Sequence, residues 1–178
     1  MNRILGTITT FNQHFDEIAN GGNAYRPSNC PHCRCGGMWH HGCYYRKADR
    51  TPDLIQSCNP VPILRFVCRS CRRTCSRLPR CIAPWRWYDW AMQQVVLLLL
   101  FAGVSLHQCC QRTCRSRSTI RRWRDWLATR SERFTFFLQG RLPELGRHAG
   151  HDAFWRHVLQ CMSLALAMVW LDKDLSVP

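Results

Sequence analysis

The chain has 178 residues, with 25 lysine or arginine residues against 11 aspartate or glutamate residues and a formal net charge of +14 at pH 7. This length excludes an assembly of several large domains and leaves room for one or two small ones. The positive charge disfavours basic partners and favours nucleic acid. The whole excess lies in residues 30–133, because residues 1–29 and 134–178 are charge-balanced.

Arginine supplies 23 of the 25 basic residues, and Lys47 and Lys173 are the two lysines. The planar guanidinium group makes bidentate contacts to phosphate and guanine, so this composition suits nucleic-acid recognition. A solvated basic surface or a GC-rich coding bias would produce the same composition. Both interpretations stay open on charge alone.

Residues 1–29 form the first predicted segment, an N-terminal arm without evident chemistry. Residues 3–9 (RILGTIT) predict a short strand. Thr10 is suited to cap a helix over residues 10–19, in which Phe11, Phe15 and Ile18 recur at helical spacing. We expect this arm to cover the small domain that follows it.

Residues 30–83 form the second segment, and two Cys-x-x-Cys pairs dominate it. Cys30 and Cys33 form the first pair, and Cys68 and Cys71 form the second. Each pair places two thiolates on one tight turn, and four thiolates suit a tetrahedral Zn²⁺ ion. The sequence therefore predicts one structural zinc ion bound by these four cysteines.

The segment between the two pairs is 34 residues long, which exceeds the usual separation of about fifteen to twenty residues. Residues 38–47 (MWHHGCYYRK) and 63–67 (ILRFV) have strand-like composition, and Pro52, Pro60 and Pro62 mark a loop between them. We therefore expect a hairpin that returns the chain to the metal. Two knuckles and a hairpin make a zinc ribbon.

The thirteen cysteines are an odd number, and the N-terminal residues lack the pattern of a secretory signal. We therefore expect a reducing compartment, the bacterial cytoplasm with association to the nucleoid, in preference to a disulfide-bonded secreted protein. One alternative concerns the ligand set. Cys35, or one of His32, His40 and His41, could replace a cysteine of the pairs.

Residues 84–133 predict a helix-turn-helix domain. Their first helix contains an apolar run, VVLLLLF, which is too short to span a bilayer. Gly103 is placed to end that helix, and Ser105 and Ser116 are placed to cap the next two. The predicted helices are residues 88–102, 106–113 and 117–129.

The last of these helices has an apolar and a basic side. Leu106, Cys109 and Cys110 are expected to face Ile120, Trp123 and Leu127. On the basic side, a recognition helix would present side chains to the major groove of duplex DNA. We expect base contacts from Arg117, Ser118 and Arg121, and phosphate contacts from Arg112, Arg115, Arg122, Arg72 and Arg73. A helical hairpin with an exposed charged face is the alternative.

Residues 134–178 form the last predicted segment, with a loop near residues 140–150 and one helix over residues 152–171. The apolar second half of that helix is too short for a membrane span. It would pack on residues 95–101 or join two copies as a homodimer. We expect no enzymatic activity, because about 45 residues after the helix-turn-helix are too few for a catalytic domain.

The two cysteine pairs, Leu78-Pro79 and residues 105–123 (SLHQCCQRTCRSRSTIRRW) together resemble the N-terminal regions of insertion-sequence transposases and their small accessory proteins. A widespread bacterial family of uncharacterised function has the same layout. The resemblance covers about residues 25–130. It implies structural zinc, a recognition helix at residues 117–123 and a mobile-element context. The chain departs from the family pattern at Arg34 and Cys114, where glycine is usual, at Cys75, where phenylalanine is common, and at Arg115, where an apolar residue is usual.

These observations predict an α+β protein: a zinc ribbon, a helix-turn-helix domain and a C-terminal helix. The predicted function is binding of double-stranded DNA at a mobile-element site, as a transposition accessory or a repressor. One alternative is an adaptor for a separately encoded transposase or recombinase. Another is a binder of single-stranded DNA or RNA that uses Trp85, Trp87 and Trp90.

Overall fold

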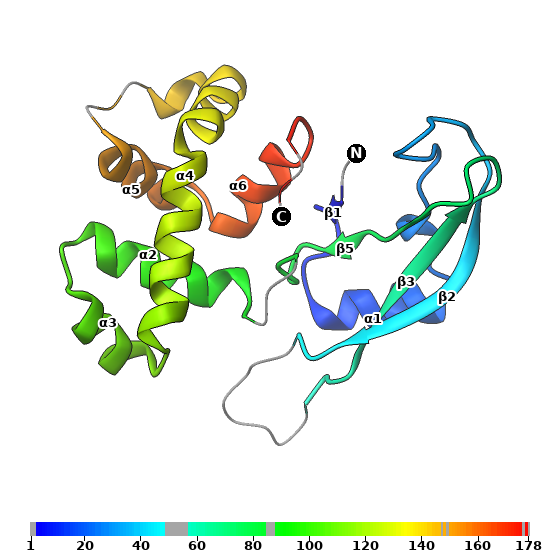
Figure 1. Cartoon of the computed structure of the whole chain (residues 1–178), viewed down its shortest axis with the longest axis horizontal. Helices are drawn as coiled ribbons and strands as arrows, with labels where there is room; N and C mark the ends of the chain where they lie inside the picture. The colour runs from blue at the N-terminus through cyan, green and yellow to red at the C-terminus, as the bar shows by residue number, and fades with distance from the viewer. Residues whose placement is uncertain are drawn as a thin grey trace. The chain divides into compact units, whose positions relative to one another are not determined.

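The computed structural model describes residues 3–48, 57–84, 88–146, 148, 150–175 and 177 (Figure 1). It combines helices with small sheets, as the α+β prediction required. The chain divides into two compact units. The sheet unit comprises residues 1–89 and 175–178, and the helical unit comprises residues 90–174.

The sheet unit contains the two predicted long strands. β2 (Met38–Arg46) and β3 (Val61–Cys68) pair antiparallel, and β4 (Thr74–Cys75) adds to the far side of β3, so that β2 is an edge strand. The predicted N-terminal strand is confirmed as β1 (Ile4–Leu5), which pairs in parallel with β5 (Leu78–Pro79).

A bulge interrupts the pairing of β2 with β3. His40 lies opposite Phe66 and Cys43 lies opposite Leu64, so two residues of β2, His41 and Gly42, share one residue of β3. Gly42 has a φ of 70°, a conformation that glycine adopts without the steric penalty of a side chain. The extra residue shifts the alternation of side chains along β2, which decides which of its aromatic residues share a face.

The predicted first helix is confirmed as α1 (Phe11–Ala19). Thr10 caps it, because its Oγ1 accepts a hydrogen bond from the Gln13 N–H at 3.2 Å and the Gln13 side chain accepts one from the Thr10 N–H at 3.3 Å. Such a capping residue stabilises a helix by about 1 kcal/mol. The chain then makes the short 3-10 helix η1 (Asn23–Tyr25) before the first cysteine pair.

His14 holds α1 and η1 against β3. Its Nε2–H donates to the carbonyl of Pro62 at 2.8 Å, and its Nδ1 therefore accepts from the hydroxyl of Tyr25 at 2.6 Å. The ring is buried, and this burial lowers the pKa of His14 despite the bond to Pro62. Around this buried network lies an apolar core that includes Leu5, Ile8, Met38, Leu64, Phe66, Cys30 and Cys68.

The helical unit begins with α2 (Trp90–Phe101), α3 (Leu106–Thr113) and α4 (Arg117–Arg141). Both predicted caps are confirmed: Ser105 forms a capping box with Gln108, and Ser116 accepts from the Thr119 N–H at 3.3 Å. A serine oxygen in this position satisfies a backbone donor that has no partner inside its own helix.

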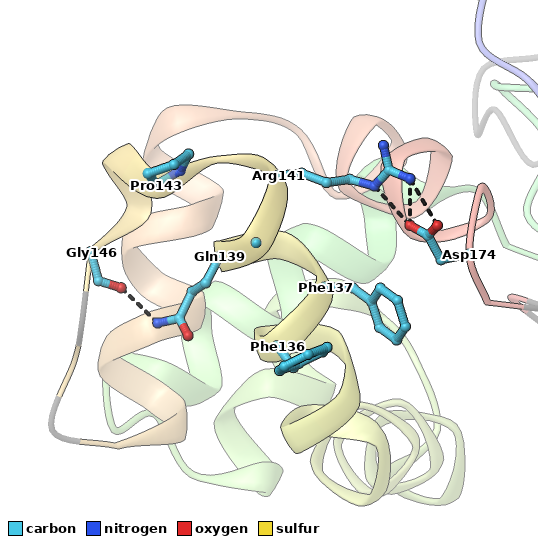
Figure 2. Close-up of a pocket in the computed structure, with 8 residues that line it drawn as sticks. Phe136, Phe137, Gln139, Arg141, Pro143, Gly146 and Asp174 are labelled. Atoms are coloured by element: carbon cyan, nitrogen blue, oxygen red, sulfur yellow. Dashed lines mark hydrogen bonds and ion pairs between the residues drawn. The ribbon is translucent and has the colours of Figure 1, made fainter.

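The predicted end of the third helix at Thr129 is wrong. α4 continues to Arg141, because Phe134 and Leu138 extend its buried apolar side by about three more turns. At its C-terminal end, Arg141 makes a bidentate ion pair with Asp174, and Gln139 donates to the Gly146 carbonyl at 2.6 Å (Figure 2). The 3-10 helix η2 (Pro143–Leu145) follows.

The single helix predicted over residues 152–171 is also wrong. It is divided into α5 (His151–Cys161) and α6 (Leu164–Leu171), which meet at an angle of 104°. Ser163 causes the division, since its hydroxyl caps α6 by accepting from the Leu166 N–H at 3.2 Å. Within the described residues, no single helix is long and apolar enough to cross a membrane, although this bent pair qualifies by combined length and composition.

Both tail helices pack on α2, which was one of the two arrangements expected for the apolar C-terminal segment. Gln94 of α2 accepts a hydrogen bond from the backbone N–H of Leu164 at 2.7 Å. Arg156 of α5 donates to the carbonyl of Phe101 at the end of α2. The apolar run of α2 is thus covered from within its own unit.

Candidate metal centre and basic surfaces

The four cysteines of the two pairs converge on one point. Their sulfur atoms all lie within 4.8 Å of one another, and Cys30–Cys71 and Cys33–Cys68 are each 3.6 Å apart. A tetrahedral ion with metal–sulfur bonds of about 2.3 Å would place its ligands about 3.8 Å apart. A disulfide would need about 2.05 Å. The four thiols therefore have the spacing of a metal site and could hold one ion.

Two matching backbone turns create this convergence. In the first, the Arg34 N–H donates to the Cys30 carbonyl at 2.9 Å, and in the second, the Arg72 N–H donates to the Cys68 carbonyl at 3.0 Å. Arg34 and Arg72 have φ values of 62° and 60°, which turn the chain sharply after each pair. Glycine would relieve the steric strain of this left-handed conformation.

The electrostatics of the cluster favour a cation. The N–H groups of Cys71 and Ser70 stabilise the Cys68 thiolate, and the pKa of Cys68 falls to about 6. The Arg73 N–H favours the Cys71 thiolate, but burial and the neighbouring sulfurs outweigh it and raise the pKa of Cys71 to about 12. Thiolates at this separation repel one another, and a divalent ion removes that repulsion.

The cluster is continuous with the core of the sheet unit. Cys30 and Cys68 are buried in the same apolar group as Leu64 and Phe66, whereas Cys33 and Cys71 pack against it and are half-buried. Cys35 is exposed and its thiol points to the Cys33 carbonyl, 3.7 Å away. Cys35, His32, His40 and His41 lie outside the cluster of four.

The predicted base-reading residues lie on the first two turns of α4. Arg117, Ser118 and Arg121 are all exposed, as is Arg122, which is a predicted phosphate contact. Ile120, Trp123 and Leu127 on the other side of the helix are buried, as is Cys109 of α3, whereas Leu106 and Cys110 are only half-buried. A shallow groove of about 460 Å³ runs along the exposed side and is lined by Ser118, Arg121, Arg122, Asp125, Trp126 and Thr129.

The turn between α3 and α4 contains Cys114, which has a φ of 52° and a left-handed conformation. Two of the predicted phosphate contacts flank this turn, with Arg112 exposed and Arg115 half-buried. Arg124, farther along α4, is paired with Asp125 at 2.9 Å, so part of its charge is locally balanced. The predicted phosphate contacts in this region therefore lie near the turn, beside the N-terminal end of α4.

Arg72 and Arg73 are exposed beside the second cysteine pair. They belong to the sheet unit, whereas the arginines of α4 belong to the helical unit. The eight residues predicted to contact nucleic acid therefore form two sets, one in each unit.

The aromatic residues suggested for base stacking divide differently. Trp85 and Trp87 lie outside the described residues. Trp90 is only 2% exposed and packs against Trp126, with ring centroids 6.3 Å apart. A buried indole cannot stack on a base, so Trp90 does not support this binding mode.

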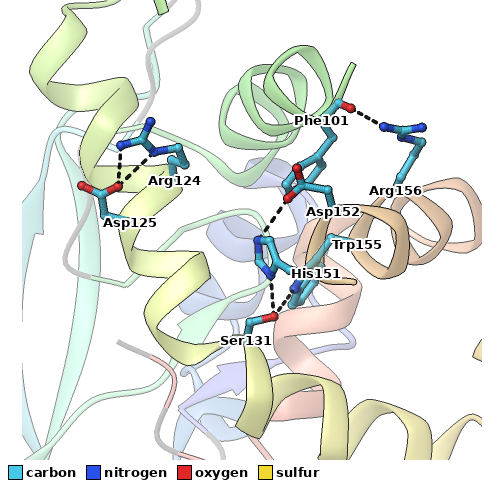
Figure 3. A network of polar contacts seen from close by, with 8 residues as sticks. All are labelled: Phe101, Arg124, Asp125, Ser131, His151, Asp152, Trp155 and Arg156. Atoms are coloured by element: carbon cyan, nitrogen blue, oxygen red, sulfur yellow. Dashed lines mark hydrogen bonds and ion pairs between the residues drawn. The ribbon is translucent and has the colours of Figure 1, made fainter. Parts of the chain in front are cut away.

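Sequence reasoning missed a polar network between α4 and α5 (Figure 3). The Ser131 hydroxyl lies 2.5 Å from Nδ1 of His151 and accepts a hydrogen bond from the Trp155 indole at 3.4 Å. Nε2 of His151 lies 3.8 Å from a carboxylate oxygen of Asp152. These contacts fix the start of α5 against α4. The available sequence signal for this network was Gly150, which lies at the N-cap position of α5 and so places His151 in the first turn of that helix.

Comparisons of the chain with protein-family models, with curated proteins and with solved structures find no match.

Proposed function

We propose that the protein is a zinc-stabilised binder of double-stranded DNA. The observation that carries this proposal is the exposed arginine face at the start of α4, opposite a side that packs on α2 and α3. An amphipathic helix of this kind presents its N-terminal residues to the major groove in helix-turn-helix proteins. In this proposal α3, the Cys114 turn and α4 form the helix-turn-helix, with α2 as its supporting helix.

The ion proposed for the four cysteines is Zn²⁺, because an all-thiolate tetrahedral set suits this soft, borderline metal. Its role is structural, since four protein ligands leave no coordination position for a substrate. The sheet unit then corresponds to a zinc ribbon, with β2 and β3 as its hairpin. The bound ion would stabilise the core that contains Cys30 and Cys68.

Arg117, Ser118 and Arg121 are the proposed contacts to base edges, and Arg112, Arg115 and Arg122 are the proposed contacts to phosphate. Arg72 and Arg73 would add sequence-independent attraction from the sheet unit. The resemblance to insertion-sequence proteins suggests a site in a mobile element, bound by an accessory or repressor in the bacterial nucleoid. A second copy would match the symmetry of a paired half-site.

Selection from a random duplex library by the zinc-loaded protein tests this proposal. The enriched duplex and a scrambled duplex would then be titrated across a range of salt concentrations. A sequence reader should prefer the enriched site by about 10³-fold or more. Equal affinities for the two duplexes, with equally steep salt dependence, would mean that the basic surfaces only attract the phosphate backbone. That result would contradict the proposal.

One observation favours an adaptor as the second candidate. Phe136 on α4 is 73% exposed beside an open cavity of about 600 Å³ that Phe137, Pro143 and Arg141 also line (Figure 2). An exposed phenyl ring next to such a hollow suits an apolar side chain of a protein partner, such as a recombinase. The adaptor predicts that no duplex sequence is enriched.

A further inference from the structure

The edge strand β2 carries aromatic side chains on the surface of the molecule. Trp39 is 61% exposed and Tyr44 is 38% exposed, although both stand in a strand whose partner β3 is largely buried. Large aromatic rings are mostly buried in folded proteins, because burial of their surface stabilises the fold. Their exposure together on this one strand therefore indicates a surface that contacts something else.

The bulge in β2 places these two rings on the same face of the sheet. Trp39 lies opposite Val67 and Tyr44 lies opposite Ile63, and these two residues of β3 are four positions apart and share a face. Arg65 stands between them on that face, opposite the bulge. Without the extra residue, Tyr44 would point to the other side.

A second arginine completes this surface. The Arg69 guanidinium lies 5.9 Å from the centre of the Trp39 ring, close enough for a cation–π contact, and leaves most of the ring exposed. Arg65 is held in place from β4, since it donates to the Thr74 hydroxyl at 3.3 Å. We call Trp39, Tyr44, Arg65 and Arg69 the Trp39 surface.

The segment that carries the Trp39 surface is strongly basic. Residues 30–89 contain eleven lysines and arginines against three aspartates. Arg34, Lys47, Arg72 and Arg73 are exposed members of this group. A polyanion is therefore the complementary partner.

We propose that the Trp39 surface binds single-stranded nucleic acid, with bases stacked on Trp39 and Tyr44 and the phosphate backbone held by the arginines. Interleaved aromatic rings and arginines are the general means of binding single strands. The two rings are about 13 Å apart along the strand, at about 3.3 Å per residue pair, so each would take a separate base. In a duplex the faces of the bases are already stacked, which excludes this contact.

This surface is independent of the duplex-binding face proposed for α4, and it would give the protein a second activity. A protein that holds both a duplex site and an adjacent unpaired strand could act where DNA is opened or cleaved. A polypeptide paired along the open edge of β2 is the alternative occupant. The excess of eleven basic over three acidic residues in residues 30–89 favours the nucleic acid.

The test uses the full, zinc-loaded chain and a fluorescein-labelled oligothymidylate of about 20 nucleotides, with binding followed by anisotropy. Trp39→Ala and Tyr44→Ala should each weaken binding roughly 5- to 150-fold, the loss that follows from removing one stacked base. Trp39→Phe should keep most of the affinity, because a phenyl ring still stacks. Arg69→Gln should make the slope of log K against log[salt] shallower by about 0.7, which is the contribution of one phosphate contact in a single strand.

Phe136→Ala is the matched control. Phe136 is even more exposed than Trp39 but lies in the helical unit, so its removal should leave oligothymidylate binding unchanged. Circular dichroism and zinc content should be the same in all variants. An equal loss in Phe136→Ala, or wild-type affinity in Trp39→Ala, would overturn the proposal. A third outcome would also overturn it. If the wild-type protein did not bind the oligonucleotide but self-associated, and Trp39→Ala abolished that self-association, the Trp39 surface would be a protein interface.

The two nucleic-acid proposals can fail separately. Trp39→Ala should leave the affinity for the selected duplex unchanged, whereas Arg121→Gln should leave the affinity for oligothymidylate unchanged. If no duplex sequence is enriched but the single strand binds through Trp39, the α4 proposal fails and this one stands. A single substitution that abolishes binding of both ligands alike would contradict the assignment of separate surfaces.

Discussion

Arg34 and Arg72 have the same backbone conformation, with φ values of 62° and 60°, and each directly follows the second cysteine of its pair. Each backbone N–H closes its turn on the carbonyl of the first cysteine. The two knuckles are therefore copies of one turn, although the two residues between the cysteines differ, Pro31-His32 in the first and Arg69-Ser70 in the second. Both pay a steric penalty for a side chain in a left-handed position.

Arg34→Gly should therefore stabilise the zinc-loaded sheet unit. Relief of the left-handed strain is worth about 1 kcal/mol, partly offset by the greater backbone freedom of glycine in the unfolded chain. Urea unfolding of the zinc-loaded protein measures the change. Arg73→Gly is the control, because Arg73 carries the same charge without a positive φ and its replacement should destabilise slightly. Equal gains in both variants would point to charge instead of backbone strain.

Cys71→Ser should abolish metal binding and unfold the sheet unit, because a hydroxyl is a poor replacement for a thiolate ligand of the proposed zinc ion, and that ion would stabilise the core that contains Cys30 and Cys68. Zinc content by atomic absorption and near-ultraviolet circular dichroism measure both effects. Cys35→Ser should retain one zinc ion and wild-type spectra, since Cys35 is exposed outside the cluster. If the two serine variants lost zinc equally, the ligand set would include Cys35.

Much of the fold could be predicted from local signals. Thr10, Ser105 and Ser116 mark helix starts because a short polar side chain caps them, and the structure has all three helices beginning immediately after these residues. The cysteine spacing alone was enough to identify the four thiols that converge. These features depend on residues close together in the sequence or on a metal-ligand pattern.

The errors arose where tertiary packing extends or divides a helix. The third helix was predicted to end at Thr129, yet Phe134 and Leu138 continue the spacing of Leu127 and are buried in the helical unit. Ser163 divides the apolar tail by capping α6, a local signal that the surrounding apolar residues obscured. The exposure of Trp39 follows from the edge position of β2, which composition does not reveal.

The helical unit should lose stability as the pH falls below the normal pKa of histidine. Burial lowers the pKa of His151, although the nearby Asp152 carboxylate raises it in part. The unfolded chain therefore binds a proton more readily than the folded one, and the contribution of neutral His151 is complete above about pH 6.5 and lost below it. Urea midpoints between about pH 7.5 and 5.5 measure this loss.

Asp152→Asn sharpens that prediction. Removal of the carboxylate leaves burial unopposed, so the pKa of His151 should fall further, and its titration by nuclear magnetic resonance should move to lower pH. The free energy of unfolding should then fall more steeply on acidification. An upward shift of the His151 titration in this variant would contradict the assigned environment.

Arg121→Gln separates base reading from charge at the start of α4. If Arg121 contacts a base edge, its loss should weaken the selected duplex roughly 5- to 150-fold and affect scrambled duplex far less. Arg122→Gln, on the adjacent position and proposed to contact phosphate, should weaken both duplexes alike. Fluorescence anisotropy with both duplexes at one salt concentration measures the two ratios.

Arg133→Gln is the control for net charge, because Arg133 is also exposed on α4 but lies three turns beyond Arg121, away from the proposed groove contacts. It should leave the ratio of specific to scrambled affinity at the wild-type value. The ratio isolates sequence reading, since the loss of one positive charge weakens both duplexes together. If Arg121→Gln and Arg133→Gln lowered the two affinities by the same factor, α4 would attract DNA without reading it.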